Sequence, residues 1–403
     1  MSIQPGPAGE PASSRNAWGA VFALTLCVST LIASEFMPVS LLTPIASDLH
    51  LTDGQAGQAI SVSGIFAVVT SLFISTATRR IDRRTLLLSL TLLMLASGLM
   101  VAFAPNFALM MCGRALLGIV IGGFWSMSTA VVMRLVSERE VPRALALLNG
   151  GNALATTVAA PLGSFLGQYI GWRGAFFCVV PLAGVTLAWQ LASLPSLPPR
   201  GRSGAGATFR VLRRPRVPYG IAAVTLLFMG QFALFTYLRP FLETVTHVNV
   251  STLSLILLVV GVGGLVGTSL IGLFLRNRLY PVLVVMPLAM AAIAVGLIAF
   301  GSFVLAATAL LALWGLIGTA APVGWWTWLS KVLPEDAEAG GGLMVAAIQL
   351  AITLGASAGG FLFDRAGYET TFAVSAAILC GSALLALAAS RQEKGKLAPL
   401  PVR

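Results

Sequence analysis

Charged residues are scarce in this sequence. Of its 403 residues only 10% are charged and 57% are hydrophobic, with a mean hydropathy of +0.90, whereas a soluble domain is about 25% charged. This shortage excludes an ordinary soluble globular protein. The apolar runs are about 18 to 25 residues long, the length that an α-helix needs to cross a hydrocarbon core of roughly 30 Å. The sequence therefore predicts an all-α protein that crosses a membrane many times.

Cysteine, histidine and nucleotide-binding motifs are also sparse or missing. The four cysteines lie inside apolar runs without paired spacing, and His50 and His247 have no other metal-ligating residue nearby. We expect no disulfide and no metal site. Neither a G-x-x-x-x-G-K-[ST] loop nor H-E-x-x-H occurs. These absences argue against an enzyme or an ATP-driven pump, with no catalytic residue and no cofactor to assign, and leave an ion gradient as the energy source.

The basic residues follow the membrane topology. The net charge is +11, but the Arg residues lie in short loops between apolar runs rather than on one soluble face, so nucleic acid is not an expected partner. The loops on one side carry "RRIDRR" at 79–84 and "RGRSGAGATFRVLRRPR" at 200–216. By the positive-inside rule this bias places both termini in the cytoplasm. The partner is then the lipid bilayer, and we expect a monomer in a bacterial inner membrane.

Apolar runs and a linker divide the chain into two halves. The runs are 17–42, 55–78, 85–103, 107–134, 143–169, 174–194, 217–238, 251–275, 281–299, 303–329, 341–363 and 371–390. We expect a cytoplasmic tail at 1–16, a six-helix bundle at 17–194, a basic cytoplasmic linker at 195–216, a second six-helix bundle at 217–390 and a cytoplasmic tail at 391–403. A shift of 196 residues lays "GWRGAF" (171–176) on "GYETTF" (367–372), and Gly163 on Gly359. Two parallel repeats of this kind predict a substrate site between the halves.

Two opposite charges lie inside apolar runs, Glu35 in the first and Arg114 in the fourth. At 1.5 Å per residue both fall in the outer half of the membrane, at similar depth. An intramembrane ionisable residue is by default a functional candidate. Glu35 and Arg114 are therefore the candidates for proton coupling, because a carboxyl group that takes up a proton on one side and releases it on the other can drive transport. A static ion pair, or a Glu35 wetted from outside, remains open.

Neutral polar and aromatic residues fill the rest of the expected cavity. The candidates are Trp125, Asn149, Asn152, Gln231, Tyr237, Trp314, Trp325 and Gln349. Amides pair with base edges or hydroxyls, and indole planes stack on flat rings. This lining favours a neutral, partly flat, polar substrate. Each amide is also explained by a helix–helix hydrogen bond, and each Trp near a span end by interfacial anchoring.

Several motifs resemble those of a known family. "GRALLGIVIG" (113–122) is similar to the fourth-helix motif of major facilitator antiporters, and "AAPLGSFLGQYIGWRGAF" (159–176) to their fifth-helix Pro/Gly motif, with Pro161, Gly163 and Gly167. Pro38 is a further candidate for a conformational role, because it removes a helix hydrogen bond beside Glu35. The family's Gly-rich loop after the second helix departs from its usual form in "TATRRIDRRTLL" (76–87). Arg79 replaces the usual Asp there, although Arg83 and Arg84 remain.

The resemblance covers nearly the whole chain and extends to members of the drug/proton antiporter family that exchange nucleosides for protons. "EFMPVSLLTPIASDL" (35–49), "PVGWWTWL" (322–329) and "AAIQLAITLGASAGG" (346–360) carry this likeness. It implies a twelve-helix major facilitator fold, two six-helix halves around a central cavity, export of purine ribonucleosides such as inosine and guanosine, and resistance to purine-analogue drugs. The alternatives are a multidrug or sugar exporter of the same fold, an uptake symporter and a nontransporting receptor.

Overall fold

The computed structural model describes residues 14–198, 211–214, 217–333 and 337–394. Parts of the predicted tails 1–16 and 391–403, and of the predicted linker 195–216, lie outside these ranges. The helices are α1 (Ser14–Leu49), α2 (Asp53–Ala77), α3 (Arg83–Ala102), α4 (Phe107–Leu135), α5 (Val141–Phe177), α6 (Val179–Ser193), α8 (Val217–Phe235), α9 (Leu238–Thr244), α10 (Val250–Phe300), α11 (Val304–Val332) and α12 (Ala337–Lys394). The described part of the chain contains no strand.

Ten helical segments of the described chain are long and apolar enough to cross a membrane. Two of them, 143–193 and 340–392, hold two crossings each, because a glycine with positive φ breaks the helix inside both. In α10 the backbone of Arg278 is also non-helical, with φ −136° and ψ 41°, and it separates the two crossings of that helix. The predicted all-α fold with twelve crossings is confirmed for these residues.

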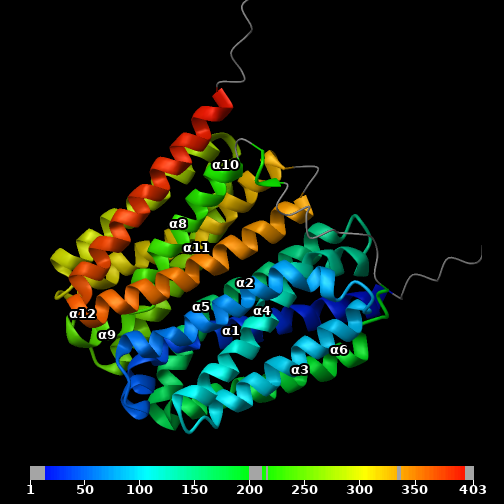
Figure 1. Cartoon of the computed structure of the whole chain (residues 1–403), viewed down its shortest axis with the longest axis horizontal. Coiled ribbons are helices and arrows are strands. Elements are labelled where there is room, and N and C mark those ends of the chain that lie inside the picture. Colours follow the sequence, from blue (N-terminus) through cyan, green and yellow to red (C-terminus); the bar gives the residue numbers. More distant parts are fainter. Residues whose placement is uncertain (1–13, 199–210, 215–216, 334–336, 395–403) are drawn as a thin grey trace, which may run out of the picture.

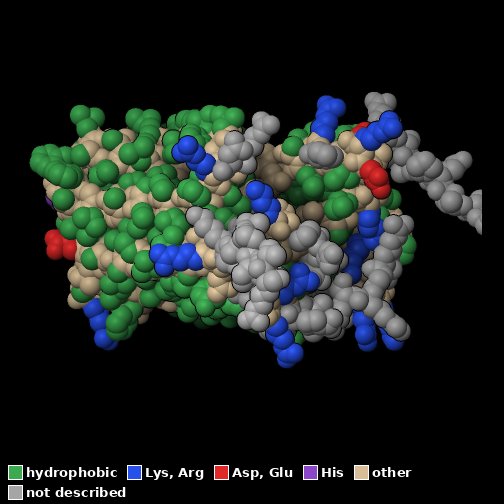
Figure 2. Space-filling view, turned by 90° about the horizontal axis from the view of Figure 1, so that it is seen from above, with side chains coloured by type: hydrophobic (Ala, Val, Ile, Leu, Met, Phe, Trp, Pro, Cys, Tyr) green, Lys and Arg blue, Asp and Glu red, His purple; other side chains and the backbone are tan. Residues whose placement is uncertain are grey.

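The two halves of the chain form two bundles. Figure 1 shows α1 to α6 side by side in one half and α8 to α12 in the other. We call the end of the molecule where α6 ends and α8 begins the linker end, and the opposite end, with the turns before α2 and α10, the distal end. Figure 2 shows hydrophobic side chains over most of the left-hand surface, whereas most Lys and Arg side chains in view lie in the centre and to the right. An apolar surface of this kind suits a protein whose solvent is lipid.

The internal repeat is visible in the backbone. Gly171 and Gly367, which the 196-residue shift aligns, have φ of 71° and 74°, a region that glycine enters without steric cost. His50 and His247 form a second pair, with φ of 54° and 55°. Thr52 and Asn249 form a third, because their side chains cap α2 and α10. The two halves thus turn at equivalent positions.

Candidate functional site

Arg114 joins three helices of the first half. Its side chain is 1% exposed, and its guanidinium donates to the carbonyls of Ser34 (2.7 Å), Glu35 (3.1 Å) and Ala59 (2.9 Å) and to the Ser63 hydroxyl (3.0 Å). These contacts occupy four of the five N–H donors of Arg. Gly118, one turn further along α4, allows this close approach, since a Cβ there would contact the Ser63 carbonyl of α2. Arg114 therefore fixes α1 and α2 against α4.

Glu35 and Arg114 do meet, but through the backbone. Arg114 contacts the carbonyl oxygen of Glu35, and the structure forms no ion pair between the Glu35 carboxylate and the guanidinium. The alternative of a static ion pair is therefore wrong in this conformation. The Glu35 side chain, 4% exposed, instead accepts a 3.4 Å hydrogen bond from the Gln349 amide of the opposite half. This leaves a buried carboxyl group at the boundary between the halves with one long hydrogen bond.

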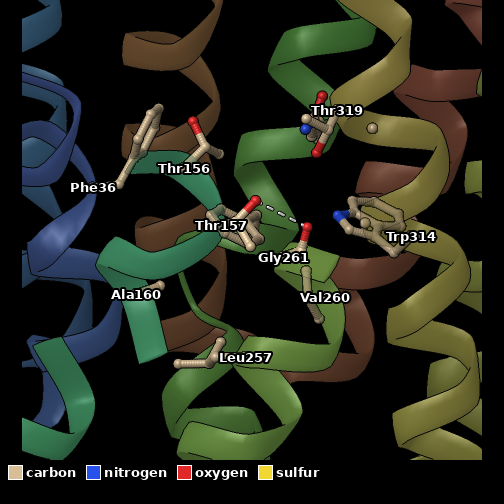
Figure 3. A pocket seen from close by; sticks show the side chains of 13 residues that line it. Phe36, Thr156, Thr157, Ala160, Leu257, Val260, Gly261, Trp314 and Thr319 are labelled. Carbon is tan, nitrogen blue, oxygen red and sulfur yellow. Dashed lines mark hydrogen bonds between the residues drawn. The ribbon is translucent and has the colours of Figure 1, made fainter. Parts of the chain in front are cut away.

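A cavity of about 70 Å³ lies at this boundary, between α1, α5, α8, α10 and α11 (Figure 3). Its walls include Phe36, Thr156, Thr157, Gln231, Trp314 and Thr319. Thr157 of α5 donates to the Gly261 carbonyl of α10 at 3.1 Å, which closes one side of it. Pockets for drug-sized ligands have about 300 to 1,000 Å³. The cavity in this conformation is thus smaller than a nucleoside requires.

Two fully buried polar atoms of the cavity lining have no hydrogen-bond partner. They are Nε1 of Trp314, whose side chain is 1% exposed, and Oε1 of Gln231. In Figure 3 the indole nitrogen of Trp314 lies on the side of the ring that faces Gly261. Buried polar atoms are nearly always paired, so each unpaired atom requires an explanation. Here a buried donor and a buried acceptor remain for a ligand to satisfy.

The other predicted cavity residues lie elsewhere. Tyr237 is fully buried, donates to the Ala356 carbonyl at 2.7 Å and stacks on Phe363. Trp325 packs edge-on against Trp328 inside the second half. The structure places the remaining three in the first half: Trp125 against Phe124, Asn149 donating to the Leu145 carbonyl of its own helix, and Asn152 half-buried on α5. None of these five lines the 70 Å³ cavity.

The predicted conformational residues pack α5 on α1. A Cβ on Gly163 would lie 2.7 Å from the Ser40 hydroxyl, and one on Gly167 would meet Leu41. Pro38 and Pro161 lie inside these two helices, which continue through them. Small residues at such positions let helix backbones approach closely. This group therefore shapes the α1–α5 interface beside Glu35.

The atypical loop after α2 is held within its own half. Arg83 donates to the Thr78 hydroxyl (3.1 Å) and Arg84 to the Leu191 carbonyl (2.9 Å). Asp82 caps α3 and accepts from Ser196 (2.5 Å) and the Leu197 amide (3.0 Å). Burial opposes ionisation, but these hydrogen bonds, with the one from the Arg84 amide, outweigh it and hold the pKa of the Asp82 carboxyl below its ordinary value.

Hydrogen bonds between the two halves are confined to the distal part of the described structure. The α2–α12 interface carries most of them, and the α5–α10 interface carries the single bond from Thr157 to Gly261. Two more join α1 to the second half, from Arg239 to the Ser40 carbonyl and from Gln349 to Glu35. A second cavity, of about 540 Å³, lies at the linker end of the first half, between α1 and α5, beside Trp18 and Arg143. The hydrogen bonds between the halves therefore join them toward the distal end.

Comparison with known proteins agrees with this architecture. The sequence model of the Major Facilitator Superfamily matches residues 22–355. The chain belongs to this superfamily. Among major facilitator structures, it superimposes on a bacterial homologue of the human lysosomal transporter Spinster, described as inward-facing and unoccupied, with a TM-score of 0.75 at 14% identity, covering 94% of this chain and 98% of that one. The fold is therefore that of a transporter and not of an enzyme.

Two curated relatives of this major facilitator protein match nearly the whole chain. The purine ribonucleoside efflux pump NepI of Escherichia coli is 41% identical over 386 residues, which cover 96% of this chain and 98% of NepI. The transcription regulatory protein OpdE of Pseudomonas aeruginosa is 56% identical over 390 residues, covering 96% and 97%. The likeness to NepI confirms the family resemblance seen in the sequence.

Sequence reasoning missed the cavity threonines and the residues that join the halves. Thr156, Thr157 and Thr319 line the cavity, and Asp364 binds the start of α2. Hydroxyls are common in membrane helices, where they bond to their own backbone, so their residue type carries little information. The repeat itself was the signal that could have found them. It relates Thr157 to Thr353 and Gly64 to Gly261, and in the structure Thr157 contacts Gly261 and Thr353 contacts Gly64.

Proposed function

We propose that this protein is a proton-coupled antiporter that exports purine ribonucleosides, such as inosine and guanosine, from the cytoplasm. The observation that carries the proposal is the unpaired donor of Trp314 and the unpaired acceptor of Gln231 in one aromatic-lined cavity between the halves. A purine base offers a donor and an acceptor on its edge and a flat face for an aromatic ring. The name of NepI, a purine ribonucleoside efflux pump, supports this cargo.

We infer the orientation in the membrane from the charges at the two ends, whereas the outward direction of transport is supported by the likeness to NepI. Near the linker end lie Arg83, Arg84, Arg134, Arg139, Arg143, Arg213, Arg214, Arg278, Lys331 and Arg391, whereas Arg173, Arg239 and Arg365 lie toward the distal end. The positive-inside rule then places the linker end in the cytoplasm of a bacterial inner membrane. With its distal end closed, the conformation described above faces inward, and its 70 Å³ cavity has to widen before it can hold a nucleoside.

Glu35 is the proposed proton carrier. It is buried at the boundary of the halves and holds only one hydrogen bond at its carboxylate, from Gln349 of the other half. A buried carboxylate with few partners is costly, so gaining a proton as the distal side opens and losing it as the linker side opens would link proton entry to cargo exit. Arg114 stays charged and positions the Glu35 backbone.

Labelled inosine in everted membrane vesicles tests the proposal. An imposed proton gradient, acidic inside, should drive inosine and guanosine accumulation, and a protonophore should abolish it. Uridine serves as the pyrimidine control. Vesicles that accumulate an unrelated drug or sugar in a gradient-dependent manner but never a purine ribonucleoside would refute the cargo assignment and favour an exporter of another substrate class.

The likeness to OpdE favours a second candidate, because that protein is named as a transcription regulatory protein. In this reading the chain senses a membrane signal and affects gene expression without carrying cargo. The two candidates separate in a deletion strain complemented with Glu35→Gln. If transcript changes are restored by a variant that no longer transports, sensing is the function; if they follow transport, they are a consequence of export.

A further inference from the structure

Asp364 lies on α12 at the distal end of the molecule, three residues before the break at Gly367, and it bridges the two halves. Its carboxylate accepts a hydrogen bond from the Thr52 hydroxyl at 2.6 Å and another from the Gly54 amide at 2.9 Å. Thr52 is the N-cap of α2, and the Gly54 amide belongs to its first turn. The first N–H groups of a helix lack intrahelical partners, and the helix dipole favours an anion beside them. A carboxylate of one half therefore completes a helix start in the other.

The backbone around this contact is shaped to admit it. A Cβ on Gly54 would contact the Asp364 carboxylate and lie 2.6 Å from the Gly360 carbonyl, so only glycine fits without displacement. One turn further, a Cβ on Gly57 would collide with the Tyr237 hydroxyl of the second half. This α2–α12 interface, one of two seams between the halves, continues through hydrogen bonds from Ser357 to Gln58 and Ser61. The other seam is the α5–α10 interface. Asp364 is thus the outermost member of a close polar interface.

The equivalent position of the other seam has no such contact. Asn249, the repeat counterpart of Thr52, caps its own helix through the Thr252 amide at 2.9 Å, and no hydrogen bond from the first half reaches it in the described structure. At the linker end the comparable acid, Asp82, caps α3 and binds Ser196 and Leu197 in its own half. Among the described residues, an acid-to-helix contact across the halves therefore occurs at one end of one interface.

We propose that Asp364 is a latch that holds the distal end closed. Its two hydrogen bonds exist only while α2 and α12 meet, so they stabilise the conformation closed at the distal end relative to the one open there. Hydrogen bonds to charged groups contribute enough that losing this pair should raise the ratio of distal-open to distal-closed molecules by about tenfold. The inference rests on the movement of two halves and not on the identity of the cargo or on proton coupling.

Distances between spin labels in the full-length protein test this directly. Labels at Ala108 and Leu305, both exposed and at equivalent starts of α4 and α11, report the distal end. Labels at Arg139 and Lys331, also exposed, report the linker end. The exposed cysteines Cys112, Cys178 and Cys380 are first replaced by Ser, and the buried Cys27 is kept. Asp364→Ala should populate longer distal distances and shorter linker-end distances at fixed pH and without substrate.

Glu369→Ala is the matched control, because Glu369 is an exposed acid of the same helix whose side chain bonds only to Tyr368 of its own half. It should leave both distributions unchanged. Gly54→Ala should reproduce the shift by steric displacement without removing a charge, and it decides the question if Asp364→Ala fails to fold. Unchanged distal distances in Gly54→Ala and Asp364→Ala, or an equal shift in Glu369→Ala, would overturn the latch. Because no nucleoside or proton gradient is used, failure here is separate from failure of the proposed function.

Discussion

The two halves have equivalent backbone turns and helix starts, but they differ in the polar side chains that they bury. The 197-residue offset that relates His50 to His247 also relates the starts of α4 and α11, and it pairs Arg114 with the buried Leu311 and Glu35 with Phe232. The first half thus buries charge in the middle of its crossings, whereas the charged residues of the second half, including the buried Arg239, lie near the ends of its crossings. The second half instead supplies the unpaired Trp314 and Gln231. In the proposed mechanism, one half carries the proton and the other recognises a neutral cargo.

The largest expected effect removes the titratable group. Glu35→Gln should abolish proton-driven inosine accumulation, about a hundredfold loss, while inosine binding remains within about twofold, because the amide keeps the size of the side chain but cannot exchange a proton. The measurements are vesicle uptake and equilibrium binding. The exposed Glu138, changed to Gln, should transport normally. Gradient-driven uptake in Glu35→Gln would remove Glu35 from the mechanism.

Arg114→Leu gives the first half the residue that the second half has at the equivalent position, Leu311, and it should lower the stability of the folded protein. It removes the charged donor from the carbonyls of Ser34, Glu35 and Ala59, and a buried hydrogen bond to a charged group contributes about 1.5 to 3 kcal/mol. The apparent Tm in detergent should fall by several degrees or the protein should fail to accumulate. Arg365→Leu, which removes an exposed Arg stacked on Phe361, is the control. Equal Tm values would contradict the network.

Trp314→Phe should separate recognition from stability. The indole N–H has no partner in the structure, so its removal breaks no internal hydrogen bond, and the loss of Tm should match that of Trp325→Phe, which removes the same ring volume from another buried site. Loss of a hydrogen bond to the base should raise the inosine KM about tenfold. Trp325→Phe is the matched control, since its N–H is also unpaired but lies outside the cavity. Equal KM values in both variants would place recognition elsewhere.

Gly171→Ala and Gly367→Ala test whether placing a side chain at positive φ costs the same free energy at the equivalent turn of each half. Neither glycine has a heavy atom within 4 Å of a built Cβ, so the cost comes from positive φ alone and should be about 1 to 2 kcal/mol at each site. Thermal unfolding should show similar Tm losses for the two variants. Gly150→Ala, with equal space but helical φ, should be neutral or stabilising. Unequal losses would show that the repeat is not energetically symmetric.

The smallest effect concerns the Asp82 loop, which has no acid at the corresponding place in the second half. Because the pKa of Asp82 is lowered by folding, its stabilisation is present above the ordinary value of 3.8 and is lost as pH falls through the folded value. Asparagine caps a helix about as well as aspartate, so Asp82→Asn should lower the Tm only slightly at pH 7, through loss of the carboxylate charge. The difference from the unchanged protein should shrink as the pH falls below 3.8, because the folded-state pKa lies below that value. A difference that persists there would show that the carboxylate charge is not involved.

Sequence predicted the fold well because crossings depend on long apolar runs and basic loops, which are local patterns. It also predicted that Glu35 and Arg114 lie at similar depth, since helix rise fixes position along the axis. It could not predict that Arg114 binds backbone carbonyls and not the carboxylate, because that depends on the rotation of α1 about its axis. The prediction that Gln349 and Tyr237 line the cavity was wrong for a similar reason. Residue type does not reveal which face of a helix meets which neighbouring helix.

Two glycines at mid-depth have a mechanical consequence. Gly64, which contacts Thr353, and Gly261, which contacts Thr157, each lie eleven residues into their helices, about 16 Å from the distal end. A line through these two contacts is a natural axis of rotation, because the glycines let the facing helices approach closely there: a Cβ on Gly261 would meet the Thr157 backbone, and one on Gly64 would meet the Thr353 hydroxyl. A turn of about 20° around it would part the distal ends by about 6 Å while closing the linker ends. A larger side chain at either glycine would move the pivot itself and so change how far each end can open.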